Sequence, residues 1–208
     1  MTSPPGPGGA TPTVADGAER QRLLALGRRL EYITLGWNVV GIVVLAVAAI
    51  RAGSVAAGGF GLDSLIEIGA SAVVLWELAD THRARQQRAL KLIGGAFVAL
   101  AVYLAVQSSL LLALGDHPGP SYLGIAWTAV TAAAMFTLAR GKAVTGRALG
   151  NPVLQTEGKV TTVDGILAVA VLIGLVLNAA LGWWWADPAA AYVLVYYGAR
   201  EAHHALSE

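Results

Sequence analysis

Four long stretches without a charged side chain constrain this sequence more than any other feature. They contain no Asp, Glu, Lys or Arg and cover residues 32–50, 92–115, 118–139 and 165–186. A helix that rises 1.5 Å per residue needs about 20 residues to cross roughly 30 Å of hydrocarbon, which is close to the length of each stretch. The composition agrees, because 56% of the residues are hydrophobic, 13% are charged and the mean hydropathy is +0.61. The sequence therefore predicts an integral membrane protein.

Two further segments complete an expected bundle of six helices, one containing acidic residues and one with only a short apolar part. We expect an all-α fold with transmembrane helices at about 31–51, 54–80, 89–115, 120–140, 154–181 and 186–205. These helices form one domain over residues 19–206. It follows a tail at residues 1–18, rich in Pro, Gly and Thr, that we expect to be disordered. Cysteine is absent, which excludes disulfides and thiolate metal ligands.

The basic residues predict the orientation of the helices, because Lys and Arg in short loops are retained on the cytoplasmic side of a membrane. With six helices, all but one of the 14 Lys and Arg residues fall on the same side, and only Arg51 falls on the other. We therefore expect both termini to lie in the cytoplasm. An even number of helices follows from the same distribution.

Three carboxylates fall in segments expected to lie deep in the hydrocarbon. Asp63 and Glu67 are four residues apart on one face of the second helix, and Asp164 in the fifth helix has nearly the same depth, about 15 Å from the helix start. An ionisable residue at this depth costs at least about 2.5 kcal/mol. No Lys or Arg falls in the central part of an expected helix, so no internal ion pair is expected to offset this cost. We expect the carboxylates to bind a proton or a cation from solution.

Ligand chemistry leaves the cation open. Asp63, Glu67 and Asp164 offer only oxygen, which suits manganese, magnesium or ferrous iron, whereas zinc favours His nitrogen and Cys sulfur. The further candidate ligands are water, Asn38, Gln107 and Glu157. Glu157 lies about 10 Å nearer to the cytoplasm than Asp164, so it fits the mouth of a site better than its centre. The alternative is that hydrogen bonds to neighbouring hydroxyl and amide groups hold the acids neutral as a packing device.

The segment "GSVAAGGFGLDSLIEIGAS" resembles the second helix of the cation diffusion facilitator family of metal transporters. In that motif an acidic residue, Ser and a second acidic residue four positions after the first precede a run of small residues, and these match Asp63, Ser64 and Glu67. The segment "WWWADPAAAYVLVYYGARE" is similar to the start of the sixth helix of the family. The resemblance covers about residues 20–206.

The segment "TEGKVTTVDGILA" resembles the fifth-helix motif of the same family, which reads acidic residue, two residues, His, three residues, Asp. The matching positions here are Glu157, Val160 and Asp164, so a valine stands where the family has its His. The resemblance implies that one nitrogen ligand of the usual metal site is absent. We also expect this chain to lack the cytoplasmic C-terminal domain typical of the family, as in a divergent bacterial subgroup.

The resemblance implies a multi-pass transporter of the bacterial inner membrane that exports zinc, manganese or iron, and not an enzyme. The same resemblance implies that the metal is exchanged for protons by alternating access. It also implies that the protein is a homodimer in contact with the lipid bilayer. No prosthetic group is implied, and the sequence has no motif typical of nucleic-acid binding. Two alternatives stay open from the residues alone. One is a proton-coupled exporter of organic cations, and the other is a membrane metal sensor or interaction protein that does not transport.

Overall fold

The computed structural model describes residues 14–77, 83–115 and 117–207, and these residues form six α-helices and no strand. The helices are α1 (Val14–Ala52), α2 (Val55–Glu77), α3 (Arg83–Leu114), α4 (Tyr122–Leu149), α5 (Pro152–Leu181) and α6 (Ala186–Ser207). The expected all-α fold is confirmed. Within the described ranges, four helical segments are long and apolar enough to cross a membrane: Gly17–Ala52, Phe97–Leu114, Tyr122–Leu149 and Glu157–Leu181.

Three helices extend well beyond the limits expected from hydropathy, namely α1, α4 and α3, which begins at Arg83 instead of residue 89. α1 already begins at Val14, so residues 14–18 of the expected tail are helical, while residues 1–13 lie outside the described residues. α4 continues past Arg140 to Leu149 and ends where Gly150 adopts a left-handed conformation with φ 61°. Residues 141–149 contain no proline, so nothing in the chain stops the helix before this glycine. The extension places Lys142 inside a helix.

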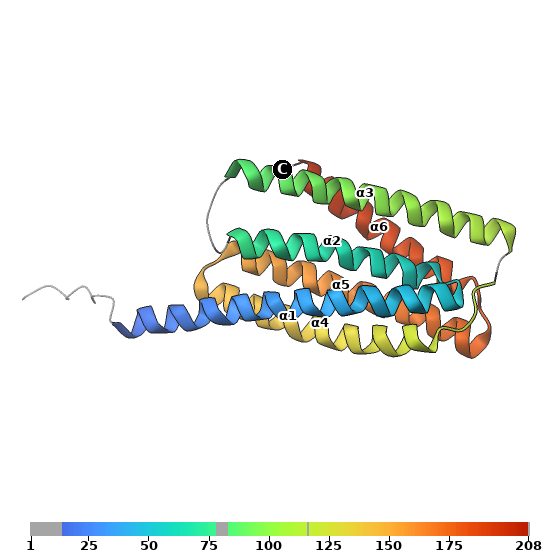
Figure 1. Ribbon diagram of the computed structural model, residues 1–208, viewed down its shortest axis with the longest axis horizontal. Coiled ribbons are helices and arrows are strands. Elements are labelled where there is room, and N and C mark those ends of the chain that lie inside the picture. Colours follow the sequence, from blue (N-terminus) through green and yellow to red (C-terminus); the bar gives the residue numbers. More distant parts are fainter. Residues whose placement is uncertain (1–13, 78–82, 116, 208) are drawn as a thin grey trace, which may run out of the picture.

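The helices run alternately in opposite directions, as Figure 1 shows, so that α1 begins and α6 ends towards the same end of the bundle. α4 packs most extensively on α5, α1 contacts both α2 and α4, and α2 contacts α5. These four helices form a closed group. α3 and α6 pair with each other and pack beside this group through α2 and α5.

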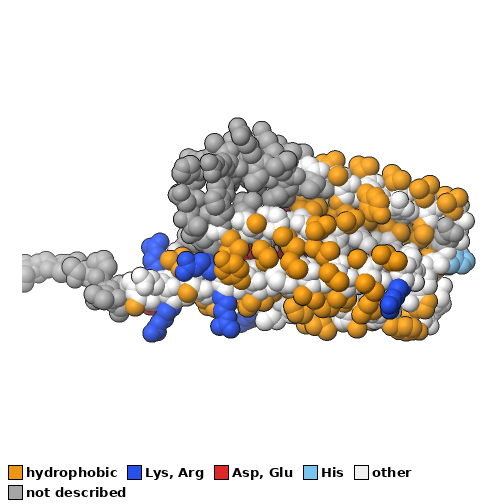
Figure 2. All heavy atoms as spheres, viewed as in Figure 1, with side chains coloured by type: hydrophobic (Ala, Val, Ile, Leu, Met, Phe, Trp, Pro, Cys, Tyr) orange, Lys and Arg blue, Asp and Glu red, His pale blue; other side chains and the backbone are white. Residues whose placement is uncertain are grey.

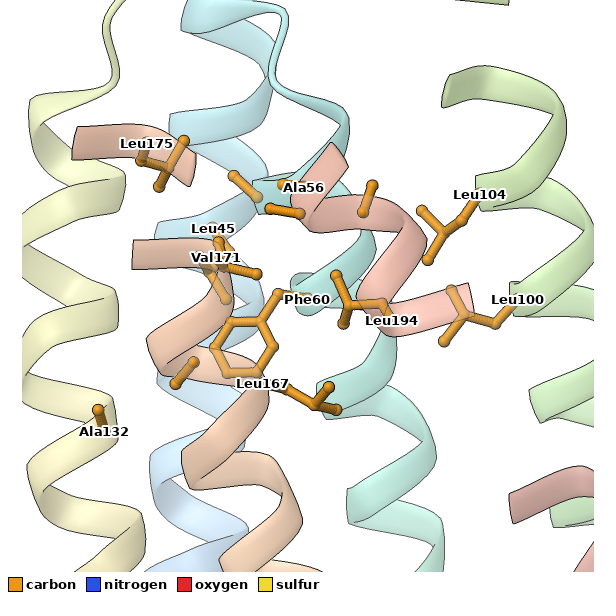
Figure 3. Packing of buried hydrophobic residues seen from close by; sticks show 14 residues of the cluster. Leu45, Ala56, Phe60, Leu100, Leu104, Ala132, Leu167, Val171, Leu175 and Leu194 are labelled. Atoms are coloured by element: carbon orange, nitrogen blue, oxygen red, sulfur yellow. The ribbon is translucent and has the colours of Figure 1, made fainter. Parts of the chain in front are cut away.

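An apolar cluster joins the four-helix group to the α3–α6 pair. Its largest members, drawn in Figure 3, are Leu45, Phe60, Leu100, Leu104, Leu167, Val171, Leu175 and Leu194. Lipid is as apolar as these side chains, so close packing rather than exclusion from water must hold the helices together in a membrane. Gly174 permits such packing, because a Cβ there would lie 2.7 Å from the Cβ of Ala190 and 2.8 Å from the carbonyl oxygen of Ala186.

The outer surface of α1 is strongly apolar. Its exposed large hydrophobic side chains include Tyr32, Ile33, Val39, Val40, Val43, Val47 and Ile50. Figure 2 shows hydrophobic side chains along this face, with most of the basic side chains gathered towards the end where α1 begins. A continuous apolar surface of this extent is rare in proteins surrounded by water. The surface is suited to contact with lipid.

Candidate functional site

Buried polar side chains from three helices form what we call the central acid cluster. It consists of Asn38 from α1, Asp63 and Glu67 from α2, and Asp164 from α5, and each of these residues is buried. Asp63 and Glu67 share a face of α2 because they are one helical turn apart. The contact between α2 and α5 brings Asp164 to the same region. The three acids that the sequence places at similar depth are therefore neighbours in the structure.

The contacts within this cluster leave oxygen atoms unpaired. The side-chain amide of Asn38 donates a hydrogen bond to Oε2 of Glu67 at 2.7 Å. The carboxyl groups of Glu67 and Asp164 lie within hydrogen-bonding reach of each other, and Asp63 interacts electrostatically with both. Oε1 of Glu67 and Oδ2 of Asp164 are buried without a hydrogen-bond donor. A proton shared between the two carboxyl groups, or a cation, would satisfy these atoms.

The acids do not form a finished coordination sphere in this conformation. Among the residues that the structure describes, no group of three or more His, Cys, Asp or Glu side chains is arranged so that it could hold one metal ion. Asp63 would have to approach Glu67 and Asp164 more closely for all three to bind the same ion. That the three acids bind a metal stays a prediction.

A second buried cluster lies around Lys142 of α4, and we call Glu31, Lys142 and Glu157 the lysine triad. Nζ of Lys142 donates to Oε2 of Glu31 at 3.1 Å, to Oε1 of Glu157 at 3.3 Å and to Oγ1 of Thr161 at 3.1 Å. Lys142 and Glu31 have no exposed side-chain surface. The ammonium group therefore has an acceptor for each of its three protons.

Small residues between α4 and α5 explain this approach. A Cβ at Gly158 would lie 3.0 Å from the backbone nitrogen of Ala143 and 3.2 Å from the carbonyl oxygen of Ala139. Gly158 directly follows Glu157, and Ala143 directly follows Lys142. The close backbone contact therefore holds the two charged side chains at hydrogen-bonding distance.

The lysine triad corrects the expectation that no internal ion pair offsets the buried acids. That expectation is wrong for Glu157, a candidate metal ligand, because Lys142 pairs with it. The sequence reasoning missed Lys142 because it ended the fourth helix at residue 140. A helical pattern could have found it, since the buried positions Thr128, Thr131, Met135, Leu138 and Lys142 recur at intervals of three and four.

Glu67 connects the two clusters. It interacts electrostatically with Asp63 and Asp164 on one side and with all three members of the lysine triad on the other. Together the two clusters hold five carboxyl groups and one ammonium group: Glu31, Asp63, Glu67, Glu157, Asp164 and Lys142. If every group were ionised, five negative charges and one positive charge would leave a net charge of −4. A buried region cannot hold that charge without protons or cations.

No protein-family model matches the chain, and a search of curated proteins finds no match either.

Proposed function

We propose that this chain exports a divalent metal cation from the cytoplasm in exchange for protons. The observation that carries this proposal is the excess of buried carboxyl groups over the single buried lysine in the two connected clusters. A region with so many buried acids must alternate between bound protons and bound cations if the carboxyl groups ionise at all. Such alternation is the chemical basis of proton-coupled cation exchange.

The proposal that a metal ion is transported, and not only a proton, is supported by the resemblance of α2 and α5 to the cation diffusion facilitator motifs. In our proposal Asp63, Glu67 and Asp164 lose their protons and bind the metal from the cytoplasm. The hydrogen bond from Asn38 orients Glu67. A rearrangement of the bundle then exposes the site to the other side, where protons displace the metal. The cation is zinc, manganese or iron, and the oxygen ligands favour the last two.

Six spans with both termini in the cytoplasm belong to the same proposal. α2 has 23 residues and α6 has 22, so each is roughly 33 to 35 Å long and could cross the hydrocarbon. α2 packs against α1 and α5, and α6 packs against α3 and α5, and each of these partners is a longer apolar helix, which supports this assignment. The protein would then be a multi-pass protein of a bacterial inner membrane, and we propose that it works as a homodimer.

Metal-driven proton exchange in sealed proteoliposomes tests the function. We expect Asp63→Asn and Asp164→Asn each to abolish exchange while leaving the fold intact, because Asn keeps the shape and removes the charge. Thr128→Val is the matched control, since Thr128 is buried in α4, lies outside the family motifs and donates to the carbonyl oxygens of Gly124 and Ile125 in its own helix. The control should exchange metal at close to the wild-type rate.

The same assay separates the alternatives. Wild-type rates in both Asn variants would contradict a carboxylate metal site. Exchange of protons for an organic cation, without a response to metal, would identify the first alternative. Metal binding without any exchange in the wild-type protein would favour a sensor or interaction protein.

A further inference from the structure

The lysine triad holds more negative than positive charge. It contains two carboxyl groups and one ammonium group, and Lys142 and Glu31 have no exposed side-chain surface. Lys142 contacts only one oxygen of Glu31, and Oε1 of the same side chain is buried without a hydrogen-bond partner. A purely structural ion pair would need one acid for this lysine. The second acid leaves a net charge of −1 when all three groups are ionised.

A proton balances this charge better than a metal ion does. The ammonium group of Lys142 already occupies the space between the two carboxyl groups, and it would repel a divalent cation at the same place. A proton on either acid brings the net charge of the triad to zero. The other acid can then remain a carboxylate paired with Lys142, so that no buried charge is left without a partner.

We propose that Glu31, Lys142 and Glu157 form a proton-binding site, separate from the central acid cluster, in which the two acids share one exchangeable proton. The titratable groups that face this site are Glu31 from α1, Glu67 from α2, Lys142 from α4, and Glu157 and Asp164 from α5. The hydroxyl of Thr161 from α5 also faces it. The existence of this site does not depend on metal transport.

Coupling of the site to metal rests on the proposed function. When Glu67 has lost its proton, its negative charge favours a proton on the triad, because Glu67 interacts electrostatically with both of its acids. A divalent cation bound at Glu67 would cancel that charge and weaken the hold on the proton. Metal binding would therefore release the shared proton, and protonation would in turn weaken metal binding.

Infrared difference spectroscopy of the metal-free protein in lipid nanodiscs tests the proton site directly. As the pH is lowered, the wild-type protein should gain the signal of protonated carboxyl groups, including one group per chain from the triad. Glu31→Gln should remove that signal, because it leaves one acid paired with one lysine. Glu157→Gln should remove the same signal for the same reason. Both variants keep a neutral ion pair, so both are expected to fold.

Two controls sharpen this experiment. Lys142→Met removes the positive charge and should have the opposite effect, a gain of about one protonated carboxyl group per chain at neutral pH. Asp63→Asn changes the central acid cluster and should leave the part of the signal that depends on Glu31 in place. A wild-type signal in both Gln variants would overturn the proton site. Loss in only one of them would show that the proton belongs to a single acid and would overturn its sharing.

Calorimetric titration with Zn²⁺ or Mn²⁺ in buffers of different ionisation enthalpy tests the coupling. Glu31→Gln should bind the metal and release about one proton fewer per metal than the wild-type protein. Equal proton release in the two proteins would overturn the coupling. If the wild-type protein binds neither metal, the proposed function fails, whereas the infrared result for the proton site still stands.

Discussion

At the residue scale, Lys142 is the buried cation that neutralises charge on two buried carboxyl groups. Its ammonium group is the hydrogen-bond donor to both Glu31 and Glu157. We expect Lys142→Met to lower the free energy of unfolding by about 3 to 5 kcal/mol near neutral pH, because it leaves buried acids without their counter-charge. Thermal or denaturant unfolding in detergent micelles measures this loss.

A control for Lys142 is the exposed Lys159 on α5, where Lys159→Met should change stability by no more than about 0.5 kcal/mol. The triple substitution Glu31→Gln, Lys142→Met and Glu157→Gln removes the acids together with the lysine. It should be more stable than Lys142→Met alone, since no buried charge is left unpaired. Equal stability of Lys142→Met and the wild-type protein would mean that the ion pairs contribute nothing.

Val160 gives a second prediction at this scale. It is half-buried on α5 and precedes the buried Asp164 by one helical turn, at the position where the family motif has a His. We expect Val160→His to add a nitrogen ligand and to shift metal preference towards zinc relative to manganese. Competition binding with the two metals measures the ratio of affinities. An unchanged ratio in a folded variant would show that position 160 does not reach the bound metal.

At the element scale, one carboxylate joins the start of α2 to the first turn of α6. Asp187 accepts hydrogen bonds from the hydroxyl of Ser54 at 2.5 Å and from the backbone nitrogens of Val55 at 2.9 Å and Ala56 at 3.3 Å. The first N–H groups of a helix have no partner within the helix, so this side chain caps α2 from another helix.

We expect Asp187→Ala to destabilise the protein by about 1 to 2 kcal/mol, because the backbone nitrogens of Val55 and Ala56 lose their acceptor. Asp187→Asn keeps one acceptor oxygen and should lose less. Hydrogen exchange of the amides of Val55 and Ala56 locates the effect, since their protection should fall in the Ala variant. If protection falls equally throughout the bundle instead, the contact does not act as a local cap.

The limits of the helices show what hydropathy can and cannot predict. Stretches without charge identified most of the helical segments, because the cost of burying charge in hydrocarbon is large. The same reasoning ended the fourth helix at Arg140, although the backbone continues to Gly150. Helix formation depends on propensity and on a stop signal, and charged residues such as Lys142 and Arg147 are good helix formers.

At the scale of the whole molecule, the two clusters differed in how far the sequence could predict them. Asp63 and Glu67 share a face through their spacing, and equal depth in the second and fifth helices was enough to place Asp164 near them. The lysine triad could not be found in this way, because Lys142 lay outside the expected fourth helix and so had no depth in the membrane to compare with that of Glu31 and Glu157. The contact within the triad depends on which faces of α1, α4 and α5 meet, and packing between helices decides that.

Orientation in the membrane is the last prediction. The chain contains no cysteine, so a single introduced cysteine reports its own position without a background signal. Suitable exposed positions are Ala18 in α1, Ala148 near the end of α4 and His117 between α3 and α4. We expect Ala18→Cys and Ala148→Cys to react with a membrane-impermeant maleimide only from the cytoplasmic side, and His117→Cys only from outside.

These positions distinguish six spans from other arrangements because Ala18 precedes the first expected span, His117 follows the third and Ala148 follows the fourth. None of the substitutions changes the number of Lys and Arg residues, which sets the orientation. Labelling in intact cells and in inside-out vesicles measures each side separately. Val43→Cys is the control, since its exposed side chain lies on the apolar face of α1 and should react from neither side. If His117→Cys reacts from the cytoplasm, an even number of spans lies between Ala18 and His117, and the arrangement with six spans is wrong. The proposed transport path from the cytoplasm to the outside through the carboxyl clusters would then be wrong.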